Sequence, residues 1–449
     1  MKLWHHIFAI LLVAIPWANI EVNDAAVAQK LPCALLALTV LPAKLPRNPN
    51  VVDPSFRPLP GARALFGEYA CAGYRIEVPN NWNGDLVLYA HGFRGATQAL
   101  TVTDLPVRQA ALSQGFAWAA SSYRVNGYNP QAGVKDTLLL TDLFKQKVGV
   151  PKRIFLYGSS MGGQVVVNSL ESHADVYAGG VAECGAVSGA GQLDYMIGFN
   201  TLADYFAKTD MFAPQNRSLK SQQQLIKQQV YPALGSSNFV YSEDNLLMGE
   251  YNPAPPINLT PQGKAFRNAA IYLSGGDRPF AEAGFAASYK LAIEGPRILV
   301  ALLPPLALAA TNKTTTYQID PSYRISNQDI NNGVRRVSSR PLIRSQFAVT
   351  GKLKAPLLTI HGTGDGFVPI TNEQTYLQMV KAAGQSDLLV QRGVRRFVHC
   401  DFSLAERTRT FNDLTRWVKN GVKPEGEDLS GSLKDVGKKW TEPKRPDDN

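Results

Sequence analysis

The sequence predicts an α/β fold, in which a mostly parallel sheet is covered by helices on both faces. Two observations carry this prediction. Strand-like and helix-like segments alternate along residues 69–191 at the spacing of strand–helix–strand units. The alternation then stops and resumes near residue 356, which indicates one core interrupted by a long insertion.

The first part of the core covers residues 69–191, where apolar runs alternate with segments of helical periodicity. The expected strands are residues 69–78, 84–90, 116–121, 153–157 and 179–183, and the expected helices are residues 107–114 and 134–148. Residues 29–68 are rich in proline instead and predict an irregular arm laid over the core.

The insertion covers residues 192–346, where helix-like segments and proline clusters replace the strands, so we expect a largely helical cap. The second part of the core covers residues 347–421. Its expected elements are strands at 356–361 and 387–392 and helices at 374–383 and 403–419. The polar residues 422–449 are expected to form a fraying tail.

The N-terminus has the pattern of a signal peptide over residues 1–28. Lys2 precedes a short apolar segment at residues 7–15, and Ala26 and Ala28 supply a small-x-small cleavage site. The apolar segment is short for a bilayer span, although an uncleaved anchor is the alternative. We therefore expect a secreted or periplasmic protein with no stable membrane span after cleavage.

The composition is that of a folded globular protein, with 45% apolar and 18% charged residues. The net charge of +10 comes from 46 Lys and Arg against 36 Asp and Glu, but these basic residues are scattered along the chain. No basic helix or aromatic-rich RNA motif is present, so no nucleic-acid partner is expected. Binding to an anionic surface or polymer is the alternative reading of the charge.

The chain has four cysteines, Cys33, Cys71, Cys184 and Cys400, an even number that permits two disulfides in an exported protein. Four cysteines allow three pairings, and spacing alone does not choose among them. A Cys33–Cys71 bond would tie the proline-rich arm to the first strands. There is no C-x-x-C and no cysteine–histidine cluster with zinc spacing, so no metal site is expected.

The segment Gly158-Ser159-Ser160-Met161-Gly162 is the strongest chemical signal. It follows the apolar run at residues 154–157 and leads into a helix-like segment. A sharp strand-to-helix turn lifts a serine hydroxyl clear of the backbone, and glycines on both sides admit the strain and the close packing. We therefore expect Ser160 to be a nucleophile.

A nucleophilic serine needs a base and an acid that orients it. After signal cleavage four histidines remain, and His399 is the candidate base because it lies in a loop between a late strand and the last helix. His91 and His361 each close a strand, and His173 lies at the far end of the helix after the serine. Asp365, in a glycine-flanked loop after the strand at 356–361, is the expected acid, with Asp401 as the alternative.

The expected oxyanion donors are the backbone N–H groups of Met161, at a helix N-terminus, and of Phe93, in the loop 91–95 after a strand. Arg94 in that loop, and Tyr123 and Tyr128 after the strand at 116–121, are candidates for substrate contacts. Ordinary loop packing is the alternative for the two tyrosines.

Together these motifs resemble the α/β-hydrolase superfamily, and in particular secreted serine esterases and lipases. The chain order Ser160, Asp365, His399 matches the nucleophile–acid–base order of that fold, and His91-Gly92 is similar to its oxyanion loop. The resemblance covers residues 69–420. It implies a sheet of about eight strands with a cap inserted after the sixth strand.

The resemblance also implies a Cys184–Cys400 bond, because the strand that ends at Cys184 would lie between those carrying Ser160 and Asp365. Secreted tannases and feruloyl esterases also tie a cysteine beside the histidine, but to one that precedes the nucleophile. Ser159 stands at that position here, so the chain departs from their pattern.

The predicted function is that of an exported serine hydrolase that cleaves small or polymeric carboxylic esters through an acyl-enzyme, without a cofactor. The cap is expected to choose the substrate through aromatic residues such as Phe199 and Phe206. A capped exopeptidase is the nearest alternative, with an acid from the cap (Glu243, Glu250 or Glu282) to hold a free amino terminus. A non-catalytic binding protein on the same fold is a second alternative.

Overall fold

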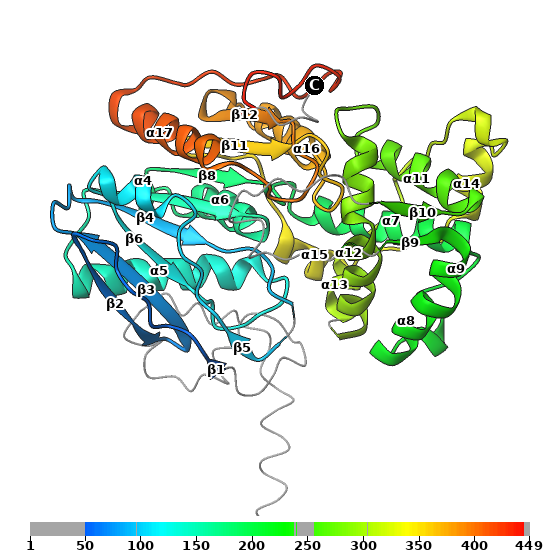
Figure 1. Cartoon of the computed structure of the whole chain (residues 1–449), viewed down its shortest axis with the longest axis horizontal. Coiled ribbons are helices and arrows are strands. Elements are labelled where there is room, and N and C mark those ends of the chain that lie inside the picture. Colours follow the sequence, from blue (N-terminus) through cyan, green and yellow to red (C-terminus); the bar gives the residue numbers. More distant parts are fainter. Residues whose placement is uncertain (1–49, 96, 238, 240–255, 303, 444–449) are drawn as a thin grey trace, which may run out of the picture.

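The computed structural model describes residues 50–95, 97–237, 239, 256–302 and 304–443. The predicted signal peptide at residues 1–28 and Cys33, one half of the expected Cys33–Cys71 bond, lie outside these residues. An eight-stranded sheet forms the centre, in the order β12–β11–β8–β7–β4–β6–β3–β2 (Figure 1). The strands are β2 (Ala62–Tyr69), β3 (Ala72–Pro79), β4 (Asp85–Ala90), β6 (Ala117–Ser121), β7 (Arg153–Ser159), β8 (Gly179–Glu183), β11 (Leu357–Gly362) and β12 (Leu389–Val394).

The sheet is mostly parallel. β3 runs antiparallel to both of its neighbours, β2 and β6, whereas the other five pairs of neighbouring strands are parallel. The predicted α/β class and the expected eight strands are thus confirmed. The long insertion follows β8, which is the sixth strand of this sheet along the chain.

The expectation of an irregular arm at residues 29–68 was wrong for residues 62–68, which belong to β2. β2 is an edge strand, and its residues alternate between half-buried and exposed positions. Such a strand needs no continuous apolar run, so its signal in the sequence is weak. A short parallel pair, β1 (Asn50–Val51) with β5 (Ala99–Leu100), joins the residues before β2 to the loop after β4.

Helices cover both faces of the sheet, as the alternation of side chains along a strand requires. In β4, Leu86 and Leu88 pack into one apolar cluster, while Val87 and Tyr89 pack into a cluster on the opposite face. The first cluster involves α5 (Pro130–Lys147), α6 (Met161–Ser172) and α16 (Thr371–Ala382), and the second involves α4 (Arg108–Ser113) and α17 (Leu404–Asn420).

Local sequence sets the ends of the flanking helices. Asn129 caps α5 by accepting a hydrogen bond from the Ala132 N–H. α17 begins with a capping box between Ser403 and Glu406 and ends at Gly421, whose φ of 71° lies in the left-handed region. The N-cap residues Asn129 and Ser403 thus fix where the loops before α5 and α17 end and the helices begin.

The insertion between β8 and β11 is mainly helical and lies beside the sheet (Figure 1). Its core is aromatic, with Phe266 against Phe199, Phe285 and Tyr289. Its elements are α7 (Ala190–Ala207), α8 (Leu219–Leu225), α9 (Tyr231–Leu234), β9 (Gly235–Ser237), β10 (Ile257–Leu259), α11 (Pro261–Leu273), α12 (Ala281–Leu302), α13 (Pro304–Ala309), α14 (Asn327–Gly333) and α15 (Pro341–Arg344).

The segment after α17 packs on the core, so the expectation of a fraying tail is wrong for residues 422–443. Leu429, Leu433 and Val436 form a buried cluster with Ile370. Trp440 is also buried, and the guanidinium carbon of Arg392 lies 3.7 Å from its ring centroid. These few apolar residues pack the otherwise polar segment against the core. None of the helices in the described ranges has the length and apolar character needed to cross a bilayer.

Candidate active site

Ser160 lies on the turn between β7 and α6, in the conformation that its flanking glycines predict. It is the N-cap of α6, with φ of 58° and ψ of −119°, which is a strained backbone for a residue with a Cβ. A Cβ on Gly162 would overlap the carbonyl oxygen of Ala90, and a Cβ on Gly158 would overlap that of Gly162. Both positions therefore require glycine, and the tight turn exposes the serine hydroxyl at the end of the strand.

The structure brings the three predicted triad residues into one hydrogen-bonded chain. The Nε2 of His399 lies 2.8 Å from the Oγ of Ser160, and its Nδ1 lies 2.6 Å from the Oδ2 of Asp365. The other carboxylate oxygen, Oδ1, accepts the N–H groups of Phe367 at 2.9 Å and Val368 at 3.0 Å. Asp365 and His399 are buried, so backbone donors fix the acid and the acid fixes the imidazole.

The other histidines have separate structural roles. His91 stacks on Tyr123 at 4.0 Å, and burial, aided by the charge of Arg94, lowers its pKa to about 3. The Nε2 of His361 contacts the carbonyl of Val368 at 2.7 Å, and its Nδ1 contacts Glu373 at 3.2 Å. Burial lowers the His361 pKa, but the hydrogen bond and the charge of Glu373 outweigh burial and leave the pKa raised.

The two expected oxyanion donors lie on segments that meet at Ser160. Met161 is the first residue of α6, where a backbone N–H has no partner within the helix. The loop after β4 passes so close that a Cβ on Gly92 would lie 3.1 Å from the Cβ of Ser160. Phe93 follows that glycine and lines the same cavity as Ser160.

The bond between Cys184 and Cys400 is formed as the resemblance implied, across 216 residues of sequence. The Cys400 Sγ lies 3.5 Å from the Nε2 of His399. Within the described residues, Cys184, His399 and Cys400 are the one group close enough to hold a metal ion. Because the two sulfurs are bonded to each other, they cannot act as thiolate ligands.

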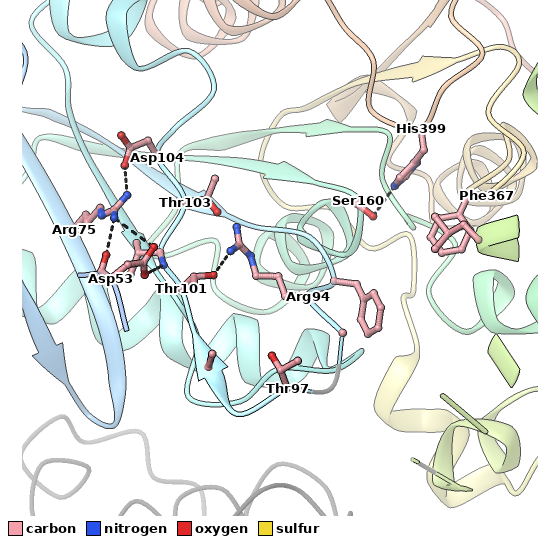
Figure 2. Close-up of a pocket in the computed structure, with 15 residues that line it drawn as sticks. Asp53, Arg75, Arg94, Thr97, Thr101, Thr103, Asp104, Ser160, Phe367 and His399 are labelled. Atoms are coloured by element: carbon pink, nitrogen blue, oxygen red, sulfur yellow. Dashed lines mark hydrogen bonds and ion pairs between the residues drawn. The ribbon is translucent and has the colours of Figure 1, made fainter. Parts of the chain in front are cut away.

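A cavity of about 720 Å³ opens over the triad. Figure 2 shows Ser160 and His399 at one end and Arg75 with Asp53 and Asp104 at the other. Arg94 lies between the two ends, and its guanidinium donates to the hydroxyl of Thr101. Apolar side chains from Phe93, Phe367 and Leu291 also line the cavity. It therefore offers an apolar and a polar wall to a molecule bound at the serine.

Of the three candidates for substrate contacts, Arg94 lines this cavity, but Tyr123 and Tyr128 do not. Both tyrosines are buried in the core, where the Tyr123 OH contacts the carbonyl of His91 and the Tyr128 OH donates to Gln164. The two tyrosines thus pack in the core under the helix that follows Ser160. The cap aromatics Phe199 and Phe206 likewise belong to the apolar core of the insertion.

Several lining residues were not anticipated. Asp53 comes from the proline-rich segment and Thr101 from the loop after β4, and neither has a motif around it. Phe367 had a usable signal, because it follows the predicted acid by two residues, and its ring lies edge-on to His399 at 5.5 Å.

Comparisons with known proteins give distant similarities. No protein-family model matches the chain. An o-phthalyl amidase from Xanthobacter agilis is 22% identical over 404 residues, covering 79% of this chain and 87% of the amidase.

Among solved structures, feruloyl esterase B from Aspergillus oryzae aligns with a TM-score of 0.48 and 16% identity, over 81% of this chain and 82% of the esterase. The acylaminoacyl peptidase of Pyrococcus horikoshii aligns with a TM-score of 0.38 and 12% identity, over 83% of this chain and 43% of the peptidase. The strand order, the serine on the turn after β7 and the sequence order of the three contacting side chains identify the chain as having the α/β-hydrolase fold.

Proposed function

We propose that this protein is a serine hydrolase that cleaves carboxylic esters through an acyl-enzyme. One observation carries the proposal. The Ser160 Oγ is 2.8 Å from the His399 Nε2, and the opposite nitrogen of that ring is 2.6 Å from a buried carboxylate. A hydroxyl, an imidazole and an acid in this order are the parts that nucleophilic acyl transfer needs.

In the proposed cycle, the Ser160 oxygen attacks the substrate carbonyl as His399 takes its proton. Asp365 holds the proton on Nδ1 and stabilises the imidazolium that forms. The N–H groups of Met161 and Phe93 stabilise the oxyanion, which is worth about 3 kcal/mol for each donor. His399 then returns the proton to the leaving alcohol. Water, activated by the same imidazole, releases the acid from the serine.

Amide cleavage is the second candidate, because the curated relative is described as an o-phthalyl amidase. The exopeptidase form of this idea needs an acid from the cap near the cavity. Glu282 is largely exposed, pairs with Arg267 at 3.1 Å and does not line the cavity, while Glu243 and Glu250 lie outside the described residues. The hydrogen-bonded chain of Ser160, His399 and Asp365 argues against a purely binding role. We keep export as part of the proposal, because a disulfide beside the base suits an oxidising compartment.

The test is turnover of p-nitrophenyl esters and of matched aminoacyl anilides by the wild type, Ser160→Ala and Ser172→Ala. Ser172 is an exposed serine at the far end of the same helix and serves as the matched control. We expect Ser160→Ala to lower kcat by about 10⁴-fold or more and Ser172→Ala to leave it unchanged. A fluorophosphonate probe should label a peptide that contains Ser160. Ester turnover by Ser160→Ala near the wild-type rate would reject the proposal.

A further inference from the structure

A buried charged residue, Glu183, ends β8 directly beside the serine turn. Its Oε1 accepts the hydroxyl of Ser159 at 2.7 Å, and its Oε2 accepts the Tyr157 hydroxyl at 2.8 Å and the Arg407 Nε at 3.0 Å. The Tyr89 hydroxyl in turn donates to the Ser159 Oγ at 3.1 Å. Glu183 and Arg407 are almost fully buried. None of these polar groups takes part in the proposed cycle.

Glu183 holds the nucleophile's turn in two ways. Its carbonyl accepts the N–H of Ser160 at 3.0 Å, while its carboxylate holds the neighbouring side chain of Ser159. A strained residue such as Ser160 keeps its conformation only where the surroundings over-determine it. These two contacts supply that constraint from the strand next to β7.

Arg407, from α17, holds the loop that carries the base. Its Nη1 donates to the carbonyl of Phe402 and its Nη2 to the carbonyl of Cys400, both at 2.8 Å. Cys400 follows His399 directly. Burial lowers the pKa of Arg407, but the charge of Glu183, the nearby hydroxyls of Tyr157 and Tyr89 and the hydrogen bond to Glu183 together outweigh burial and leave the pKa raised, so the guanidinium keeps its charge. The three side-chain hydrogen bonds of Arg407 therefore join the end of β8 to the histidine loop.

We infer that Glu183 and Arg407 are positioning residues that set the relation between Ser160 and His399 from below. A buried ion pair is a weak source of stability, since apolar residues of similar volume serve a core at least as well. This pair instead fixes the positions of the nucleophile and the base, because its hydrogen bonds end on Ser159 and Cys400, the residues next to them. The Cys184–Cys400 bond joins the same two segments covalently, one residue further along. The inference rests on the proposed function.

The first test is Arg407→Lys, which keeps the charge but cannot reach a carboxylate and two carbonyls at once. We expect kcat for the best ester substrate to fall by roughly 10- to 100-fold, because small misplacements of reacting groups cost about that much. KM should change by less than about threefold. Arg392→Lys is the matched control. Arg392 is equally buried and pairs at 2.7 Å with Asp413, which lies on α17 like Arg407, but Arg392 does not touch the loop of His399.

The pH profile separates positioning from general stability. Glu183→Gln leaves the Arg407 cation uncompensated, which disfavours the imidazolium of His399, so the acid limb of kcat/KM should move to lower pH. Arg407→Met leaves the Glu183 carboxylate alone and should move the limb to higher pH. Because Arg407 donates to the carbonyl of the residue next to His399, the two single variants should move the limb in opposite directions. Asp365, with His361 and Arg278 near it, is unchanged in both variants.

The double variant Glu183→Gln/Arg407→Met guards against a single variant that does not fold, because it leaves no lone buried charge. It should keep the wild-type acid limb and still lose kcat. Wild-type kcat in the double variant and in Arg407→Lys, with no opposite shifts in the single variants, would overturn the inference. An inactive wild type that also resists the fluorophosphonate probe would instead reject the proposed function.

Discussion

Replacing Asp365 with asparagine tests the triad with a nearly isosteric change. In the wild type, the Oδ1 of Asp365 accepts two backbone N–H groups and the Oδ2 faces the His399 Nδ1 at 2.6 Å. The two N–H donors will select the oxygen of the asparagine amide, so its NH₂ group must face the imidazole. The Nδ1 then becomes an acceptor, and the ring proton moves to Nε2, which can no longer accept the proton of Ser160.

The wrong tautomer is worth about 10⁴-fold in kcat, or about 5 kcal/mol of barrier. The assay is kcat and KM for a p-nitrophenyl ester between pH 6 and 10, with circular dichroism to establish that the variant folds. Asp142→Asn, at a half-buried residue on α5 that pairs with Lys145, is the control and should match the wild type. A folded Asp365→Asn enzyme within tenfold of the wild-type kcat would refute the reasoning.

Three further predictions concern stability. Burial lowers the pKa of His91 to about 3, so the unfolded chain binds the proton more tightly than the folded chain. The free energy of unfolding should therefore fall as the pH falls from 6.5 towards 3, by about 2 kcal/mol at pH 5. His91→Phe should flatten this dependence in urea unfolding, and an unchanged slope would contradict the assignment. Gly162→Ala should cost about 3 kcal/mol or more through overlap with the Ala90 carbonyl, whereas Gly431→Ala, with open space around it, should stay within about 0.5 kcal/mol; equal melting temperatures would contradict this. Trp440→Ala should cost about 3 kcal/mol if the C-terminal segment is packed as described, and a urea midpoint equal to that of the wild type would show that it is not.

The parts of the site that the sequence predicted are those fixed by local geometry. The glycines around Ser160 predict a tight turn, and in the structure a Cβ at either Gly158 or Gly162 would overlap the backbone. The pairing of His399 with Ser160 could be predicted because few other histidines are available to contact the serine. The Cys184–Cys400 bond could be predicted because the order of strands in a known fold places the two residues at the same edge of the sheet.

The parts that the sequence did not predict depend on tertiary packing. β2 has only one side to bury, so no continuous apolar run marks it. Tyr123 and Tyr128 follow a strand at the ligand-binding edge, yet they fold under the serine helix instead of facing the cavity. Asp53 reaches the cavity only because a short parallel strand pair brings its segment beside the loop after β4.

The origin of the cavity walls has a practical consequence. Arg94, Thr97, Thr101 and Thr103 all come from the stretch that precedes the nucleophile, whereas the described part of the insertion contributes Leu291. Efforts to redirect the enzyme by transplanting insertions between homologues would thus leave the polar lining intact. Mutant libraries aimed at a new substrate preference belong in the stretch from residue 93 to residue 104.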